Sequence, residues 1–223
     1  MQCKNIVVVG TDTEIGKTVV SLILMKQLIG KKEKPIYIKP FQTGCKDIFD
    51  RDSDAKFIYE NLGKDEIDFS KSVLNCNKNP KAPYFAARDE KTTIDIDDTL
   101  NRIKDLTQSF THSIIEMSGG LFVPITEKML VADFIQKIDC EVILVGRAGL
   151  GTINHTLLTI EALSKRGMTP TEIVLVDKNG DTNSKMTDEN IEAIEMFSGI
   201  KAKKIGRIED FDRIDSSVSL GNL

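Results

Sequence analysis

A lysine and a threonine follow a glycine soon after the first apolar run of the chain. The segment "NIVVVGTDTEIGKT" has the pattern of a strand, a loop that closes at Gly16, and a helix that begins with Lys17 and Thr18. Free N–H groups at a helix start, together with the helix dipole, favour a phosphate. A lysine here can reach the β- and γ-phosphates, and the hydroxyl can ligate Mg²⁺. The spacing predicts a nucleoside triphosphate site, and the alternative is an ordinary turn with a chance Lys-Thr pair.

This loop departs from the common Walker A pattern G-x-x-x-x-G-K-[ST] in one respect. Gly10 comes one residue early, and Thr11 stands where the first glycine is expected. The phosphate-binding prediction survives because it depends on the N–H groups at the helix start. The nucleotide contacts that we predict from this loop are Asp12, Glu14, Ile15, Gly16, Lys17, Thr18 and Val19.

Two acidic residues are candidates for holding Mg²⁺, which prefers oxygen ligands and needs one or two carboxylates beside a nucleotide. Glu116 ends the apolar run "SII", where a buried carboxylate is costly unless it meets a cation. Asp54 lies in the acidic segment "DRDSDAKF". The alternative for Asp54 is a helix cap in its "DSDA" turn. With the Thr18 hydroxyl, these residues form the predicted metal set.

A second lysine and a second glycine loop complete the candidates. Lys39 ends the run "PIYIK", so it could point to the same ligand as Lys17 and stabilise charge on a phosphoryl group. The alternative is a surface lysine whose stem lies along apolar surface. The segment "GLGTINH" opens another helix, and its N–H groups at Thr152, Ile153 and Asn154 would suit a carboxylate. A plain capped turn is the equal alternative there.

The elements that must position these residues are short β-branched runs that alternate with helical patterns. We predict strands at 5–10, 35–40, 113–120, 140–151, 172–180 and 201–208, and helices at 17–31 and 153–167. Continuous apolar strands separated by helices predict a parallel sheet that is covered on both faces. Ligands bind such sheets beyond the carboxyl ends of the strands, where the candidates lie. The polar segment 52–105 is expected to form helices and excursions around the sheet edge, within one domain, 1–223.

Composition limits the possible functions. The net charge of −4 and the pI near 5.4 argue against a nucleic-acid-binding surface. We find no run of 18 apolar residues and no signal peptide, so no membrane association is expected. The four cysteines show no CxxC pair, which predicts free thiols in a reducing cytoplasm.

The motifs taken together resemble the dethiobiotin synthetase family, which acts in biotin biosynthesis. The matching segments are "GTDTEIGKT", "KPFQTG", "SDA", "EMSGG", "PI…ADF" and "GLGTINHTLLTIEAL", in order along nearly the whole chain. The resemblance implies a three-layer α/β/α P-loop nucleotide-binding fold with a mostly parallel, about seven-stranded sheet. It also implies an ATP- and Mg²⁺-dependent homodimer that joins CO₂ to 7,8-diaminononanoate and closes a cyclic urea. The reaction passes through a carbamate and its mixed anhydride with phosphate.

The resemblance also implies roles for individual residues. Lys17 and Lys39 would hold the carbamate and the γ-phosphate, with Thr13 beside them as a third catalytic residue. Mg²⁺ would be held by Thr18, Asp54 and Glu116. The residues implied at the diamine and carbamate are Thr13, Glu14, Lys39, Thr43 and Gly119. The residues implied at the substrate carboxylate, from the opposite subunit, are Thr152, Ile153 and Asn154.

One departure from the family pattern affects the nucleotide base. Many members carry an Asn-Asp pair at the end of the strand "EIVLVD", where this chain has Asp177 at the asparagine position. A carboxylate can only accept hydrogen bonds, from the adenine amino group or from two neighbouring N–H groups of guanine. We therefore predict that GTP is accepted beside ATP.

Two other classes of protein share the phosphate loop. One is an amidation ligase of the same superfamily, but such enzymes usually carry a glutaminase domain for which 223 residues leave no room. The other is a partitioning-type ATPase switch. Such switches commonly place a second lysine near the start of the loop, where this chain has Thr11, and "DSSVSLGNL" forms no basic amphipathic tail.

Overall fold

The computed structural model describes residues 3–63, 69–180, 182–208 and 220 of the chain. The strands are β1 (Lys4–Gly10), β2 (Pro35–Thr43), β3 (Val73–Asn77), β4 (His112–Gly120), β5 (Pro124–Thr126), β6 (Met129–Leu130), β7 (Glu141–Arg147), β8 (Pro170–Val176) and β9 (Ala202–Ile205). The α-helices are α1 (Lys17–Gly30), α2 (Asp54–Asn61), α3 (Pro83–Asp89), α4 (Ile96–Thr107), α5 (Val131–Ile135), α6 (Thr152–Ser164) and α7 (Ser184–Ser198). A 3₁₀ helix, η1 (Phe69–Ser72), precedes β3.

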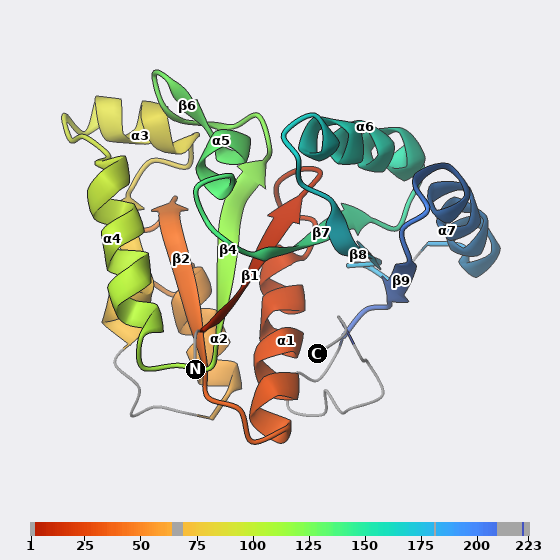
Figure 1. The fold of residues 1–223 in the computed structure, drawn as a ribbon, viewed down its shortest axis with the longest axis horizontal. Coiled ribbons are helices and arrows are strands. Elements are labelled where there is room, and N and C mark those ends of the chain that lie inside the picture. Colours follow the sequence, from red (N-terminus) through yellow and green to blue (C-terminus); the bar gives the residue numbers. More distant parts are fainter. Residues whose placement is uncertain (1–2, 64–68, 181, 209–219, 221–223) are drawn as a thin grey trace.

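The described strands form a seven-stranded sheet and a two-stranded hairpin. The sheet order is β3-β2-β4-β1-β7-β8-β9, and every neighbouring pair is parallel. The hairpin pairs β5 with β6 in the antiparallel sense. Helices cover both faces of the large sheet, so the molecule has three layers (Figure 1). The predicted α/β/α fold with a parallel sheet is confirmed.

The order of the strands explains where a ligand can bind. From β1, the chain moves outward past β4 to β2 on one side, and β7 lies directly against β1 on the other side. The chain leaves β1 toward β2 on one side and later crosses from β4 to β7 on the other side of β1. The direction of the strand order therefore reverses at β1, which opens a crevice at its carboxyl end. The phosphate loop predicted from the sequence begins there, at Gly10.

The alternation of side chains along the strands divides the core into two parts. In β1, Val7 and Val9 contribute to one hydrophobic cluster, and Ile6 and Val8 contribute to the other. The first cluster includes apolar residues of α4, α5, α6 and α7, and the second includes those of α1 and α2. Because both faces are buried, the strand sequences are continuously apolar, as the sequence suggested.

One strand was not predicted, and several boundaries differ from the predictions: β2 extends to Thr43, and α6 and β9 end at Ser164 and Ile205, three residues earlier than predicted. The segment 52–105, expected to hold helices and excursions, also contains β3, whose sequence "VLNCN" is only partly apolar because it is an edge strand. The run 140–151 leaves the sheet at Arg147, since the chain turns at Gly151, where φ is 88°, to enter α6. The run 172–180 likewise ends at Val176. The four cysteines are free thiols, as predicted.

Candidate active site

The phosphate loop leads from β1 into α1 through a glycine that no other residue could replace without strain. Gly16 caps the helix with a φ of 97°. A Cβ atom there would lie 2.8 Å from Cγ1 of Val176 at the end of β8. Glycine therefore provides both the left-handed backbone and the close approach of the loop to the sheet. The first N–H groups of α1 have no acceptor within the helix, so they are available to an anion.

Lys17 lies in the first turn of α1 with its ammonium group folded back on the loop. It is buried, and its Nζ donates a hydrogen bond of 2.7 Å to the carbonyl oxygen of Asp12. Burial and the nearby positive charge of Lys39 lower the pKa of Lys17 to about 8. The side chain is therefore a cation with little charge compensation, which is suited to a phosphate.

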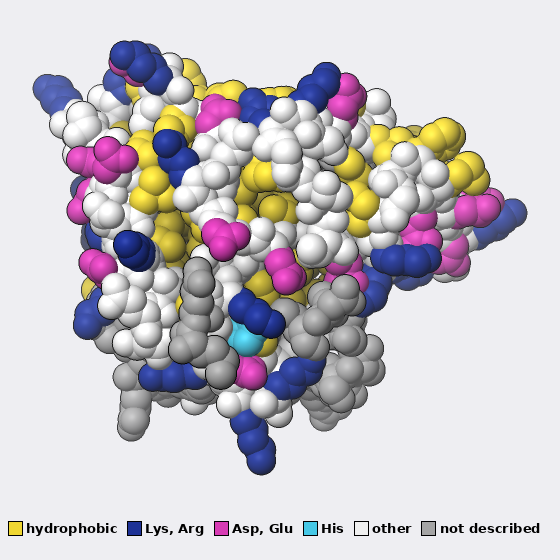
Figure 2. All heavy atoms as spheres, viewed as in Figure 1, with side chains coloured by type: hydrophobic (Ala, Val, Ile, Leu, Met, Phe, Trp, Pro, Cys, Tyr) yellow, Lys and Arg dark blue, Asp and Glu magenta, His cyan; other side chains and the backbone are white. Residues whose placement is uncertain are grey.

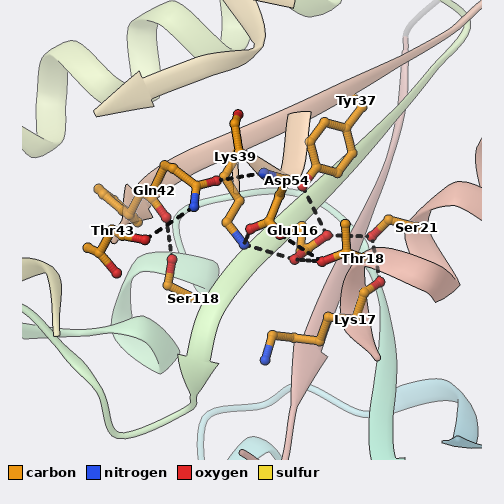
Figure 3. Close-up of polar contacts among 12 residues, drawn as sticks. Lys17, Thr18, Ser21, Tyr37, Lys39, Gln42, Thr43, Asp54, Glu116 and Ser118 are labelled. Atoms are coloured by element: carbon orange, nitrogen blue, oxygen red, sulfur yellow. Dashed lines mark hydrogen bonds and ion pairs between the residues drawn. The ribbon is translucent and has the colours of Figure 1, made fainter. Parts of the chain in front are cut away.

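Lys39 reaches the site because β2 presents every second residue to the same face. Its Nζ lies 2.7 Å from Oδ2 of Asp54 and 2.8 Å from Oε1 of Glu116 (Figure 3). Burial lowers the pKa of Lys39, but the two carboxylates outweigh burial and hold it above its ordinary value. Lys39 is thus a buried, permanently charged ammonium group, and the alternative of a surface lysine is wrong.

Asp54 is the first residue of α2, and the preceding residue, Ser53, caps the N-terminus of this helix. The Ser53 side chain accepts the hydrogen bond from the Lys56 N–H, so the Asp54 carboxylate is not the helix cap. Its Oδ1 instead lies 3.0 Å from the Thr18 hydroxyl oxygen. Burial raises the pKa of Asp54, but Lys39 and the Thr18 hydroxyl bring it below its ordinary value. The carboxylate therefore stays ionised at neutral pH.

Glu116 on β4 is the most enclosed acidic group at the site, with a residue exposure of 1%. Its Oε1 faces Thr18 at 3.0 Å and Lys39 at 2.8 Å. Its Oε2 accepts hydrogen bonds of 3.0 Å from Ser21 and from Tyr37 (Figure 3). Burial and the charge of Glu116 raise the pKa of Tyr37 well above its ordinary value, so its hydroxyl remains a donor.

A cavity of about 820 Å³ lies beside these groups at the carboxyl edge of the sheet. It is lined by eleven of the residues predicted from the sequence: Thr13, Glu14, Gly16, Lys17, Thr18, Val19, Lys39, Thr43, Asp54, Glu116 and Gly119. The structure therefore brings together the predicted phosphate loop, both lysines and the predicted metal set. Gly119 lies next to Thr13, since a Cβ atom at Gly119 would meet Thr13 Cγ2 at 3.5 Å.

The other predicted residues do not line this cavity. Ile15 is buried in the core beneath the loop, and Asp12 turns back to accept the Thr13 N–H at 2.7 Å. Asp177 is buried after β8, where its two oxygens accept the N–H groups of Gly180 and Thr182 at 3.0 and 3.1 Å. These bonds explain why the Asp177 carboxylate is turned into its own loop.

Thr152, Ile153 and Asn154 begin α6, outside the cavity lining of the same chain. The Thr152 side chain is buried and contacts Thr156 Oγ1 at 3.4 Å. Leu150, just before the helix, is 90% exposed. Both sequence alternatives for this turn, an anion site and a plain cap, therefore remain open within one chain.

Sequence reasoning missed several residues of the site. Tyr37 was detectable, because it precedes Lys39 by two positions and so shares its face of β2. Gln42, whose Oε1 accepts the Asp54 N–H at 3.2 Å, carried no sequence signal. The cavity is also lined by a group from the C-terminal strands and the turns after them: Val176, Lys178, Gly206, Arg207 and Ile208.

Two features of the described residues bear on the predictions about nucleic acid and membrane: the distribution of surface charge and the length of the helices. Figure 2 shows Lys and Arg side chains interspersed with Asp and Glu over the face it draws, without a continuous basic patch there. None of the described helices is long and apolar enough to cross a bilayer.

Comparison with known proteins identifies both sequence relatives and similar folds. A family model described as "AAA domain" matches residues 4–217. The ATP-dependent dethiobiotin synthetase BioD of Lysinibacillus sphaericus (strain C3-41) is 38% identical over 93% of this chain and 88% of its own length. The protein of the same name from Methanococcus vannielii is 35% identical over 92% of this chain and 93% of its own length.

Solved structures of lower identity share the fold. The MinC:MinD cell division protein complex of Aquifex aeolicus matches with a TM-score of 0.60 and 12% identity, over 96% of this chain and 87% of that chain. A ParA family ATPase from Chlorobium tepidum TLS matches with a TM-score of 0.55 and 13% identity, over 94% of this chain and 86% of that chain. These likenesses show the α/β fold alone and nothing of the reaction.

Proposed function

The chain belongs to the dethiobiotin synthetase family, and we propose that it catalyses the ATP- and Mg²⁺-dependent joining of CO₂ to 7,8-diaminononanoate. The products are dethiobiotin, ADP and phosphate, which makes the enzyme a cyclo-ligase that forms carbon–nitrogen bonds. The observation that carries the proposal is the convergence of Lys17, Lys39 and the Thr18–Asp54–Glu116 oxygens on one cavity.

The oxygens of Thr18, Asp54 and Glu116 fit a magnesium ion. The Thr18 hydroxyl oxygen lies 3.0 Å from Asp54 Oδ1 and 3.0 Å from Glu116 Oε1, yet a hydroxyl has a single proton to donate. Neighbouring ligands of an octahedral Mg²⁺ with bonds of about 2.0–2.1 Å lie about 2.8–3.0 Å apart. The three residues would hold the ion, whose charge would offset that of the β- and γ-phosphates.

The proposed reaction begins with one amine of the diamine, which adds to CO₂, loses a proton and forms a carbamate. A carbamate oxygen then attacks the γ-phosphorus, and the bond from that phosphorus to the bridging oxygen breaks to release ADP. The second amine attacks the carbamoyl carbon, closes the ring and expels phosphate. Positioning and electrostatic stabilisation supply most of the catalysis in such phosphoryl transfer.

The chain's own residues have distinct parts in these steps. The N–H groups at Gly16, Lys17 and Thr18 bind the phosphates at the start of α1. The ammonium groups of Lys17 and Lys39 stabilise the negative charge shared by the carbamate and the γ-phosphate. Lys39 remains protonated throughout, since its pKa is raised by its two carboxylate neighbours.

The diamine lies on the outer lip of the phosphate loop in this proposal. Thr13, Glu14, Thr43 and Gly119 line that part of the cavity. Their hydroxyl and carboxylate groups offer acceptors for amine N–H donors. The loop then holds both reactants, with the nucleotide on its helix side and the carbamate on its lip.

The substrate carboxylate binds at the start of α6 of a second subunit, in the homodimer that we propose. The N–H groups at Ile153 and Asn154 suit an anion but lie outside the cavity of their own chain, whereas the Thr152 N–H donates to the Gly149 carbonyl oxygen at 3.4 Å. The exposed apolar side chains of Leu150 and Leu158 support burial of this region against another copy. Dilution monitored by light scattering tests the dimer.

The cavity's far end, beside Val176, Lys178 and Arg207, receives the base in this proposal. Lysine and arginine side chains only donate hydrogen bonds, and both adenine and guanine present an N7 acceptor. This arrangement supports acceptance of GTP beside ATP. The four free thiols support a cytoplasmic location.

A coupled assay with 7,8-diaminononanoate, bicarbonate, ATP and Mg²⁺ tests the proposed function through formation of the cyclic urea. The competing reading is a partitioning-type switch, which the fold also fits, although Thr11 stands where such switches commonly have a lysine. Lys39→Ala separates the two. A ligase loses product formation, whereas a switch would lose partner binding and show ATP turnover that does not depend on the diamine.

A further inference from the structure

The two oxygens of the Glu116 carboxylate have different surroundings. Oε1 faces the cavity side with Thr18 and Lys39, and Oε2 faces the core with Ser21 and Tyr37. A carboxylate offers about four lone-pair positions, two on each oxygen. Those of Oε2 face Ser21 and Tyr37. The one Thr18 proton can serve only Asp54 Oδ1 or Glu116 Oε1, which leaves a position on Oε1 for a cation. The orientation of the group is therefore decided by the donors on its core side, which are buried and cannot be replaced by water.

Of those two donors, Tyr37 gives its hydroxyl proton to Glu116, whereas Ser21 divides its proton between two acceptors. The single proton of Ser21 is shared between Glu116 Oε2 and the Lys17 carbonyl oxygen, each at 3.0 Å. The Tyr37 hydroxyl donates to Glu116 Oε2 at 3.0 Å. Tyr37 is fully buried, so its ring cannot turn to another acceptor without disturbing the core.

The backbone explains why a tyrosine in the core reaches this carboxylate. Tyr37 pairs with Ile114 across β2 and β4, and Glu116 lies two residues beyond Ile114 on the same face. Lys39 lies two residues beyond Tyr37 on that face as well. The register of these two strands thus places one neutral donor and one cation on opposite oxygens of the same carboxylate (Figure 3).

We propose that Tyr37 is a positioning residue, which holds Glu116 with Oε1 toward Thr18 and thereby sets the affinity of the site for a divalent cation. This inference rests on the proposed Mg²⁺ site. Groups that orient a metal ligand from behind commonly change metal affinity by about 10–100-fold when they are removed. Because Ser21 still supports the same oxygen, we expect the lower end, about tenfold, for Tyr37→Phe.

The test measures how much a metal strengthens nucleotide binding. The affinity for a non-hydrolysable ATP analogue is determined by calorimetry in EDTA and then with Mn²⁺, and the ratio gives the metal-dependent gain. Tyr37→Phe should reduce that gain about tenfold and leave the affinity in EDTA unchanged. A purely structural role would alter both affinities together.

Tyr59→Phe is the matched control. Tyr59 is also buried in the cluster that contains Tyr37, but its hydroxyl bonds to Ser72 Oγ at 3.0 Å and to the backbone N–H of Tyr37, and it makes no contact with Glu116 among the described hydrogen bonds. It should leave the metal-dependent gain as it is in the unaltered protein. An equal gain in Tyr37→Phe and the unaltered protein would overturn the positioning role, as would an equal loss in both tyrosine variants.

Two further results distinguish a failure of the proposed metal site from a failure of the positioning role. If the unaltered protein shows no gain with Mn²⁺, the proposed metal site itself fails. If Tyr37→Phe does not fold, Ser21→Ala removes the other donor to the same oxygen and should reduce the gain by a smaller factor. An undiminished gain in Ser21→Ala, with Tyr37→Phe unfolded, would overturn the claim that the donors to Oε2 set the affinity.

Discussion

Replacing Lys39 by methionine should cost the ligand-free protein a large part of its stability. The ammonium group lies 2.7 and 2.8 Å from two carboxylates, and its removal leaves both without their cation. Breaking a buried pair by removing one partner costs about 3–5 kcal/mol. Because the Asp54 side chain is 27% exposed while that of Glu116 is 1% exposed, water relieves one carboxylate in part. We therefore expect the lower end, about 3 kcal/mol.

Chemical denaturation and a thermal melt measure this loss. In a protein of this size, about 3 kcal/mol corresponds to a fall of about 6–12 °C in Tm. The loss should also depend on pH in a defined direction. In the unaltered protein the Asp54 pKa is below its ordinary value of 3.8, so its contribution is present above that pH and is lost only as the pH falls through the lower value.

Without Lys39, the burial that raises the pKa of the Asp54 carboxyl is no longer offset by the neighbouring ammonium charge. The folded variant then binds a proton more readily than the unfolded chain, so its stability falls as the pH rises through the raised pKa. The deficit relative to the unaltered protein should be complete at pH 7.5 and smaller at pH 5. A deficit below about 1 kcal/mol, the range of exposed ion pairs, would refute the reasoning, and so would a deficit that does not shrink on acidification.

Lys17→Met is the matched control for that experiment. Lys17 is also a buried lysine of the site, but its Nζ donates to the carbonyl oxygen of Asp12 and makes no ion pair with a buried carboxylate of the described residues. We expect this change to cost much less stability than Lys39→Met, although both variants should lose ligase activity.

Three further predictions concern the ligands. Because the Lys17 pKa is about 8, the ammonium charge is present below that pH and is lost as the pH rises through it. Calorimetry should find nucleotide binding by the unaltered protein about tenfold weaker at pH 9 than at pH 7. The affinity of Lys17→Arg should not change over that range. A constant affinity for the unaltered protein would contradict the role of the Lys17 charge in nucleotide binding. Thr13→Val should raise the KM for the diamine and leave the nucleotide affinity nearly unchanged, whereas equal losses would refute the division of the loop into two halves. Turnover with GTP should lie within a thousandfold of that with ATP, and a larger preference, above about 4 kcal/mol, would show that the base is read selectively.

The sequence predicted those strands whose side chains are buried on both faces of the sheet. The run of β1 was recognised as a strand because it is short, rich in β-branched residues and followed by a glycine loop, as is typical of strands covered on both faces. The edge strand β3 was missed, since "VLNCN" is short, contains two asparagines and carries no clear period. The loops after β7 and β8 were assigned to the strands because glycine allows an extended chain as readily as a turn.

The phosphate loop and the acidic residues of the site were predictable because each follows a strand or opens a helix. The partner of each group was harder to predict, as Lys39 shows. A lysine at a strand end could extend to solvent or turn inward, and only the packing of α2 against β2 places Asp54 within 2.7 Å of it. The turn of the Asp177 carboxylate into its own loop depends on the positions of Gly180 and Thr182. Such contacts depend on tertiary geometry, which residue types alone do not specify.

The most direct test of the proposed reaction follows one oxygen atom. If a carbamate oxygen attacks the γ-phosphorus and the ring then closes with loss of phosphate, an oxygen of CO₂ must leave in that phosphate. The enzyme is supplied with ¹⁸O-labelled bicarbonate, 7,8-diaminononanoate, ATP and Mg²⁺, and the phosphate is analysed by mass spectrometry before the label exchanges with water. We predict one ¹⁸O atom in each phosphate released together with the cyclic urea. Unlabelled phosphate, or phosphate released equally without the diamine, would contradict the account.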